Sequence, residues 1–262
     1  MDNDISKGQS EADIQLPVSV VAMQHAAKRV ILSMGGKGGV GKTTFMLALA
    51  EWFASKGIMI KLLDLDTENK ARGSLSHYFG RAAKKVSIHT AAGLDSFIDY
   101  IDDASIVLAD MGASSGQVTY DWFDSMFEDV QALGVSFTAI GIVTPDPASV
   151  ESVLSWAARL QNRVQYIIVE NAITYPADFT YWRETEQAQV FQKTLHPVVL
   201  SMDFRLPELE NPARQHGITL GEIAERRHDV DELRRTSLVL RAQSYRRRLF
   251  QEIENAKHLL LP

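Results

Sequence analysis

The sequence GGKGGVGKTT, residues 35–44, is the strongest indication of fold in this 262-residue chain. Gly36 through Thr43 match the pattern G-x-x-x-x-G-K-[ST] at every position. Glycines let successive backbone N–H groups turn inward as an anion-binding nest, and the helix that follows aims its positive end at the same point. The stretch therefore predicts the phosphate-binding loop of a P-loop nucleotide triphosphatase that takes ATP and Mg²⁺. The loop residues predicted to hold the nucleotide are Gly36, Lys37, Gly38, Gly39, Val40, Gly41, Lys42, Thr43 and Thr44.

Each polar side chain of the loop has an expected task. The Lys42 ammonium should reach the β- and γ-phosphates, and the Thr43 hydroxyl should bind Mg²⁺. Thr44 would add a donor near the α-phosphate. The flanking sequence supports this interpretation, because an apolar run at 29–34 predicts a buried strand before the loop and helical spacing over 43–56 predicts a helix after it.

The same alternation continues along the chain. It predicts an α/β fold, a single domain in which helices cover both faces of a doubly wound, mostly parallel sheet. In such sheets ligands bind beyond the carboxyl ends of the strands. The further predicted strands are 58–65, 104–109, 135–143, 164–169 and 196–201, and the further predicted helices are 94–101, 120–133, 148–163 and 180–193.

Composition narrows the class of protein. The chain is 45% hydrophobic with a net charge of −6, and it contains no cysteine, which excludes disulfides, zinc–thiolate sites and iron–sulfur clusters. No apolar run has the length of a membrane span, and the N-terminus lacks the pattern of a signal peptide, so we expect a prokaryotic cytoplasmic protein. We expect a flexible tail over 1–28, a P-loop ATPase domain over 29–230 and a basic amphipathic helix packed on it over 231–262.

A second lysine inside the loop makes a resemblance specific. The sequence from Gly35 to Thr44, with Lys37 in it, resembles the deviant Walker A motif of the ParA/MinD family of dimeric ATPases. The resemblance implies a homodimer that sandwiches ATP, in which Lys37 reaches the phosphates of the opposite subunit. A second ammonium there would stabilise charge on the transferred phosphoryl group. Lys37 and Lys42 are therefore predicted to be catalytic.

Three aspartates lie at the ends of predicted strands: Asp64 and Asp66 lie at the end of the strand 58–65, and Asp110 follows the strand 104–109. By the same resemblance, Asp66 would orient the attacking water as a third catalytic residue, and Asp110 would hold Mg²⁺ as the Walker B aspartate. Asp64 would support the Mg²⁺ shell or the loop, so the predicted metal set is Thr43, Asp64 and Asp110. Residues 112–116 would then form switch II. The alternative for each aspartate is a carboxylate that only caps a turn.

Two further segments resemble parts of the family site. Asn171 follows the strand 164–169, and in MinD-like members an asparagine here hydrogen-bonds adenine, although a plain turn asparagine is the alternative. The segment Met202–Pro207 would form the other wall of the base pocket. The loop Val143–Pro147 resembles one that packs near the family's dimer interface.

The resemblance covers about residues 29–223, and the chain departs from it in one respect. Only 44 positions separate Asp66 from Asp110, which is short for a chromosomal ParA. A compact member resembles ParA-like proteins of plasmid maintenance or conjugal transfer. The lack of cysteine argues against the nitrogenase iron protein, iron–sulfur carriers and arsenite pumps.

Near the C-terminus, an apolar stripe at spacings of three and four predicts one long helix through Leu260. Its other faces carry six arginines, named here the arginine face. We weigh three interpretations: a solvated face of a packed helix, non-specific DNA binding through phosphates, and membrane targeting of the MinD kind, which Glu252 and Glu254 disfavour. The six are Arg234, Arg235, Arg241, Arg246, Arg247 and Arg248.

The function predicted from these patterns is a slow, partner-stimulated, Mg²⁺-dependent ATPase that dimerises on ATP and positions or partitions DNA or a DNA-processing complex. Its partners would be a second copy, DNA and an activating protein, and it would associate with the nucleoid if DNA is the cargo. The alternatives are a MinD-like membrane-associated regulator and a small-molecule ATP-dependent ligase of the same superfamily.

Overall fold

The computed structural model describes residues 27–34, 36–65, 73–87, 90–112 and 117–262. They form a sheet in the order β3-β2-β4-β1-β5-β6-β7, in which every neighbouring pair of strands is parallel. The predicted doubly wound α/β fold is confirmed. The strands are β1 (Lys28–Ser33), β2 (Lys61–Asp64), β3 (Ala83–Lys85), β4 (Ile106–Asp110), β5 (Val135–Val143), β6 (Gln165–Asn171) and β7 (Val198–Met202).

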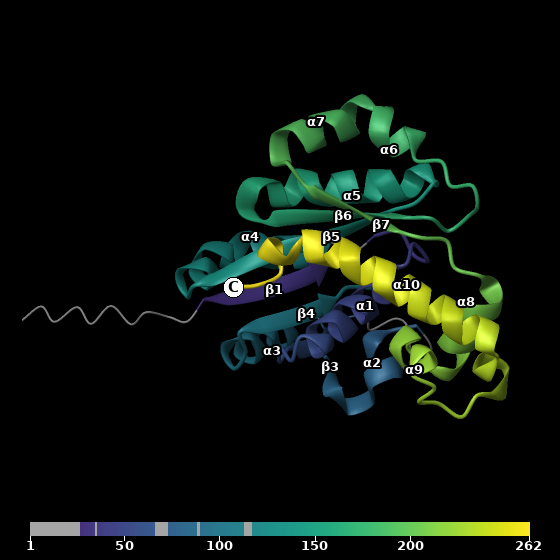
Figure 1. Ribbon diagram of the computed structural model, residues 1–262. Coiled ribbons are helices and arrows are strands. Elements are labelled where there is room, and N and C mark those ends of the chain that lie inside the picture. The colour runs from purple at the N-terminus through teal and green to yellow at the C-terminus, as the bar shows by residue number, and fades with distance from the viewer. Residues whose placement is uncertain (1–26, 35, 66–72, 88–89, 113–116) are drawn as a thin grey trace, which may run out of the picture.

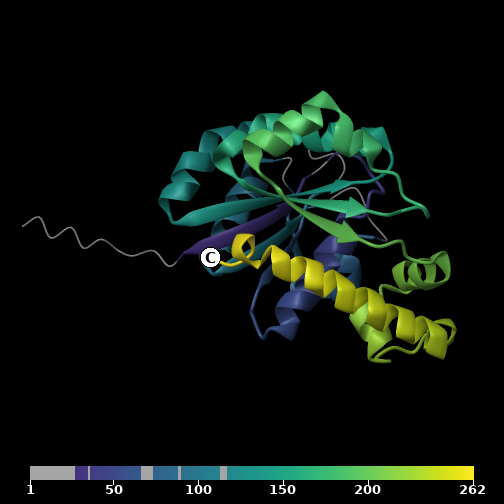
Figure 2. The same ribbon diagram turned by 45° about the horizontal axis from the view of Figure 1, so that its top comes forward.

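Helices cover both faces of this sheet (Figures 1 and 2). Successive strand residues point to opposite faces, so Val30 and Leu32 join one apolar cluster and Ile31 joins the other. The first cluster includes side chains of α3 (Ala91–Asp102), α4 (Gln117–Ala132), α5 (Pro147–Leu160), α6 (Thr180–Glu184) and α7 (Glu186–Leu195). The second includes side chains of α1 (Lys42–Ser55), α2 (Leu75–Phe79) and α10 (Thr236–Asn255).

The central strand β1 leads straight into the phosphate loop. Its neighbours are β4 on one side and β5 on the other, so strand order reverses at β1. A crevice forms beyond the carboxyl ends of the strands at such a switch point. The loop, the end of β4 and the end of β5 therefore meet at one edge of the sheet.

Several boundaries differ from the predictions. β2 is shorter than predicted because only 61–64 pair with β3 and β4, while Met59 is 90% exposed. The predicted helix over 180–193 is two helices, since Thr185 is extended (ψ 141°). The three-residue edge strand β3 was not predicted because its sequence, AKK, contains no apolar run.

α10 and the two helices before it were predicted in part. α8 (Pro207–His216) and α9 (Leu220–Ala224) were missed, and they pack with the first half of α10 in a third apolar cluster. α10 ends at Asn255, not at Leu260, and it begins at Thr236. Arg234 and Arg235 therefore precede the helix, which corrects their predicted place on its faces.

Residues 1–26 lie outside the described residues, so the tail remains a prediction. Within the described part of the chain, no helix combines the length and the apolar character needed to cross a membrane.

Candidate nucleotide-binding site

Glycine is required at particular points of the phosphate loop. Gly36, Gly39 and Gly41 all have positive φ, at 99°, 75° and 100°, a region that residues with a Cβ rarely adopt. Gly41 is the N-cap of α1, and a Cβ there would come within 2.5 Å of Asn171 Nδ2. The loop thus has both the conformation and the close packing that the glycine pattern predicts. Gly35 lies outside the described residues.

Lys42 is curled inward over this loop. Its side chain is buried, and its Nζ donates a hydrogen bond of 2.8 Å to the carbonyl oxygen of Lys37. The ammonium is therefore held across the nest at the start of α1, where a triphosphate would place its charge.

Asp110, at the end of β4, is bonded directly to the start of α1. Its carboxylate accepts hydrogen bonds from Thr43 Oγ1 at 2.7 Å and from Ser33 Oγ at 2.8 Å. Ser33 also accepts a bond of 2.8 Å from the Met111 backbone N–H. Ser33 was not predicted, and only strand order could reveal it, because it lies on β1 beside β4.

Burial sets the charge state of this carboxyl. Desolvation raises the pKa of Asp110 to about 6, against the lowering effect of the Thr43 and Ser33 hydrogen bonds. The nearby Asp64, its register partner on β2, adds to the rise by like-charge repulsion. Asp64 is fully buried and accepts a bond of 3.0 Å from the Ser76 backbone N–H.

These groups fit a magnesium ion that arrives with phosphate. Mg²⁺ typically takes one or two carboxylates with hydroxyl, water and phosphate oxygens. Thr43 and Asp110 supply a hydroxyl and a carboxylate 2.7 Å apart, and a cation would offset their buried negative charge. In the described residues no group of three or more His, Cys, Asp or Glu side chains is placed to hold a metal.

Lys37 occupies a different position from Lys42. Its backbone N–H donates to Ser152 Oγ at 3.1 Å, and its Nζ lies 3.1 Å from Asp146 Oδ2. The Lys37 side chain is 42% exposed. The pKa of Asp146 is lowered, mainly by its hydrogen bond to Lys37. The Ala148 backbone N–H, at the N-terminus of α5, lowers it further.

Asp146 and Ser152 were not predicted as partners of Lys37. The loop Val143–Pro147 was singled out by resemblance, and the order Asp146-Pro147 is typical of a helix start. Nothing local in the sequence connects this start to a lysine more than a hundred positions earlier.

Asn171 lies against the phosphate loop. Its Nδ2 donates a bond of 2.8 Å to the carbonyl oxygen of Val40, and its side chain is buried. The amide therefore braces the loop, and contact with a base remains a prediction. In the segment 202–207, Met202 Cε would lie 3.5 Å from a Cβ at Gly41, which places the start of the segment beside the loop.

Thr44 lines a cavity of about 60 Å³ between α1, α2 and α8. The buried Arg205 guanidinium, paired with Glu210 at 3.2 Å, is also in its lining. Asp66 and residues 113–116 lie outside the described residues, so the water-orienting role and switch II remain predictions.

The family model described as "CobQ/CobB/MinD/ParA nucleotide binding domain" matches residues 31–166, which is more than half of the chain. The chain belongs to this family. It is therefore a P-loop nucleotide-binding protein of the ParA/MinD kind, as the loop sequence predicts. A search of the curated proteins finds none that matches.

Two solved structures resemble the chain in fold. The MinD cell division protein of Aquifex aeolicus has a TM-score of 0.52 at 14% identity, covering 89% of this chain and 98% of that one. The MinC:MinD cell division protein complex of the same organism gives 0.51 at 14% identity, covering 89% and 97%. At this identity the likeness supports the fold alone.

Proposed function

We propose that the protein is a Mg²⁺-dependent ATPase that forms a face-to-face homodimer on ATP. The observation that carries this proposal is the contrast between the two lysines of one loop. Lys42 is buried and bonded within its own loop, whereas Lys37 lies at the outer side and is 42% exposed. An ammonium placed outward in this way suits the phosphates of a second subunit, as the family resemblance implies.

The Lys37–Asp146 ion pair is compatible with such a role. Both side chains are more than 40% exposed, and ion pairs at that exposure are weak because solvent competes with them. Bound triphosphate carries more negative charge than one carboxylate, so it can replace Asp146 as the partner of Lys37. We infer that Asp146 holds Lys37 in the nucleotide-free monomer.

The chemistry then divides among the residues of the site. Lys42 and the loop N–H groups would bind the phosphates, and Thr43 and Asp110 would hold Mg²⁺, which offsets the phosphate charge. Lys37 of the partner subunit would stabilise the charge that develops on the transferred group. Asp66 would orient the attacking water, and a separate activating protein would accelerate a slow basal reaction.

Lys37→Ala tests the proposal. The variant is expected to bind ATP within about threefold of wild type, because Lys42 and the nest remain. It should stay monomeric in sedimentation velocity with Mg²⁺ and a non-hydrolysable ATP analogue, and lose at least about tenfold in turnover, since a charge supplied in trans is worth more than that in related sites. Lys84→Ala, at an exposed lysine of β3, is the matched control. If Lys37→Ala dimerises and hydrolyses ATP normally, this proposal is wrong and the small-molecule ligase alternative is favoured.

We further propose that the dimer binds DNA through part of the arginine face. Three of the six arginines have carboxylate partners: Arg234 with Asp229, Arg246 with Glu225, and Arg248 with Asp203. In the described residues no carboxylate lies within 4.0 Å of the charged groups of Arg235, Arg241 or Arg247. The positive charges of these three arginines are therefore not offset by a neighbouring carboxylate. We propose that these three, of the six, contact DNA phosphates.

The same helix argues against the membrane alternative. The apolar stripe of α10 is buried against the domain, with Leu238, Leu249 and Ile253 at most 7% exposed. Insertion into a lipid surface would require that stripe. The positioning of DNA, a plasmid or a conjugation complex is therefore the favoured output.

A salt titration measures the DNA contact. Each lost phosphate contact is expected to reduce the slope of log affinity against log salt by about 1. Arg241→Gln with Arg247→Gln should lower that slope by about 2 for non-specific duplex with ATP present. Arg248 is already paired with Asp203, so Arg248→Gln should leave the slope nearly unchanged. An unchanged slope in the double variant would rule out this surface.

A further inference from the structure

The loop between β6 and α6, residues 172–179, presents apolar side chains to solvent. Ile173 is 45% exposed and Tyr175 is 86% exposed. Of the eight large apolar side chains that are exposed among the described residues, two lie on this loop and a third, Tyr181, lies at the start of α6. Single exposed apolar residues are ordinary, but neighbouring ones are typical of a contact surface.

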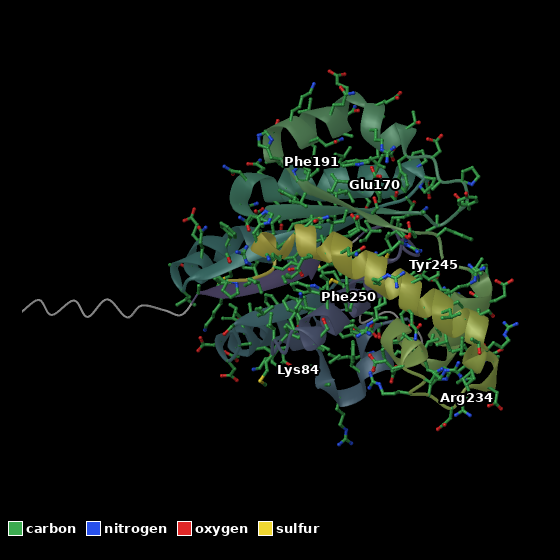
Figure 3. All side chains as sticks on the ribbon, in the orientation of Figure 1. Lys84, Glu170, Phe191, Arg234, Tyr245 and Phe250 are labelled. Carbon is green, nitrogen blue, oxygen red and sulfur yellow. The ribbon has the colours of Figure 1, made fainter. Side chains whose placement is uncertain are left out.

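Both ends of this loop are fixed by side-chain bonds. Arg183 on α6 donates two hydrogen bonds to the Glu170 carboxylate at the end of β6, from Nε at 3.1 Å and from Nη2 at 2.5 Å. Glu170, labelled in Figure 3, is buried. Tyr181 Oη also donates to Glu151 Oε1 on α5 at 3.2 Å. The base of the loop is thus held, which limits the ordering cost of binding through its tip.

Residues on both flanks of the loop are linked to the phosphate loop. At one end, Asn171 bonds to Val40 of the phosphate loop. At the other end, Glu151 is the residue before Ser152, whose hydroxyl accepts from the Lys37 N–H. In Figure 1 the loop extends past the carboxyl end of β6, on the right of the view.

We propose that the tip of this loop, residues 173–176, packs against a second copy of this chain in the nucleotide-bound dimer, with Tyr175 as its apolar anchor. This inference rests on the proposed function. If Lys37 reaches the phosphates of a partner, the partner's surface lies against the phosphate loop, and a tip that projects from the same edge of the sheet is placed to meet it. A two-fold dimer brings the same patch from both copies to the interface.

The side-chain chemistry suits this place. Tyrosine is enriched among residues that dominate binding energy, because it supplies a large contact area and a hydroxyl at low entropic cost. Ile173 and Pro176 flank it with further apolar surface. Truncation of such an anchor commonly weakens an interface by tenfold or more.

The first experiment measures dimerisation. Ile173→Ser with Tyr175→Ser should weaken the dimer at least about tenfold in sedimentation with Mg²⁺ and a non-hydrolysable ATP analogue. Binding of a fluorescent ATP analogue to dilute, monomeric protein should change less than twofold, because neither side chain bonds to the described residues of the phosphate loop. Val190→Ser is the matched control, since Val190 is 57% exposed but lies on α7.

The second experiment uses the absence of native cysteine, so that an introduced thiol is the only one in the chain. Ile173→Cys should react with a maleimide freely without nucleotide and at least about fivefold more slowly with the ATP analogue at dimer-forming concentrations. The protection should disappear on dilution to monomer with nucleotide still bound. Val190→Cys should show no protection.

The outcomes separate the two proposals. Wild-type protein that stays monomeric with the analogue would overturn the proposed dimer, and the contact with it. A dimer that forms equally well in the Ile173/Tyr175 double variant, or a thiol at 173 that is never protected, would overturn this contact alone. Protection that survives dilution would assign the tip to the bound nucleotide and also overturn the contact.

Discussion

Replacement of Lys42 by alanine is expected to lower the affinity for ATP by about a hundredfold or more and to remove measurable hydrolysis. Loss of one member of a buried charge pair commonly costs about 2–5 kcal/mol, and 1.4 kcal/mol corresponds to a factor of ten. Lys42 is buried, so water cannot easily replace its ammonium beside the phosphates. The measurement is titration with a fluorescent ATP analogue, followed by a phosphate-release assay at saturating nucleotide.

A second variant separates charge from loop shape. Because Lys42 Nζ also donates to the Lys37 carbonyl, alanine removes an internal bond as well as a charge. Lys42→Gln keeps a donor without the charge and should bind ATP as poorly as alanine. If Lys42→Gln restores binding, the role of Lys42 is to shape the loop, and the prediction is wrong. Lys37→Ala should retain monomeric binding in the same assay.

Asp110→Asn is expected to stabilise the nucleotide-free protein and to reduce strongly its stabilisation by Mg²⁺ with ATP. Burial raises the pKa of Asp110 from 3.8 to about 6, so the ionised carboxylate lowers the free energy of unfolding at neutral pH. One pKa unit corresponds to about 1.4 kcal/mol, which sets the gain at roughly 1–3 kcal/mol at pH 7. Active sites commonly trade stability for function in this way.

The sign of the pH dependence follows from linkage. Between pH 3.8 and about 6 the folded state binds a proton at Asp110 that the unfolded state has released, so this group's contribution to stability falls as pH rises. The contribution is fully present below pH 3.8 and lost above about 6. The advantage of Asp110→Asn over wild type should therefore grow from near zero at pH 4 to its full value at pH 7.

Chemical unfolding with and without ligand checks this result. Ligand at 100 times its dissociation constant stabilises a protein by about 2.7 kcal/mol, so wild type should gain about that amount with Mg²⁺ and ATP. Asp110→Asn should gain much less, because its amide is a poor ligand for Mg²⁺. A variant that is less stable than wild type at pH 7 without ligand would show that the Thr43 and Ser33 bonds outweigh the cost of burial.

Prediction from sequence succeeded where the signal is local. The strand from 135 to 143 was predicted with its observed bounds, because a long apolar run between turn residues is typical of a buried strand in a parallel sheet. It failed for β3 and α9, which are three and five residues long and bury too few side chains to show a period. The break at Thr185 was missed for another reason. The helical spacing of apolar residues continues through Thr185, although its backbone is extended.

The arginine face shows how a pattern can overstate a function. Six arginines within residues 234–248 suggest one continuous basic surface. The fold brings Asp203 and Glu225 beside two of them, and both carboxylates come from other elements. The net charge of a surface depends on those neighbours. The sequence could therefore identify candidate residues, but not the three arginines that have no carboxylate within 4.0 Å in the described part of the chain.

The phosphate loop, the alternation of strands and helices, and the aspartate that ends β4 could all be predicted from local sequence. Those features depend on backbone preferences and hydrophobic period, which act over a few residues. Three contacts depend on the folded chain: Asp146 pairs with Lys37, Ser33 joins Thr43 in bonding Asp110, and Asn171 bonds the loop at Val40. The residues in each of these pairs lie 67 or more positions apart in the sequence, and the order of the strands in the sheet brings them together.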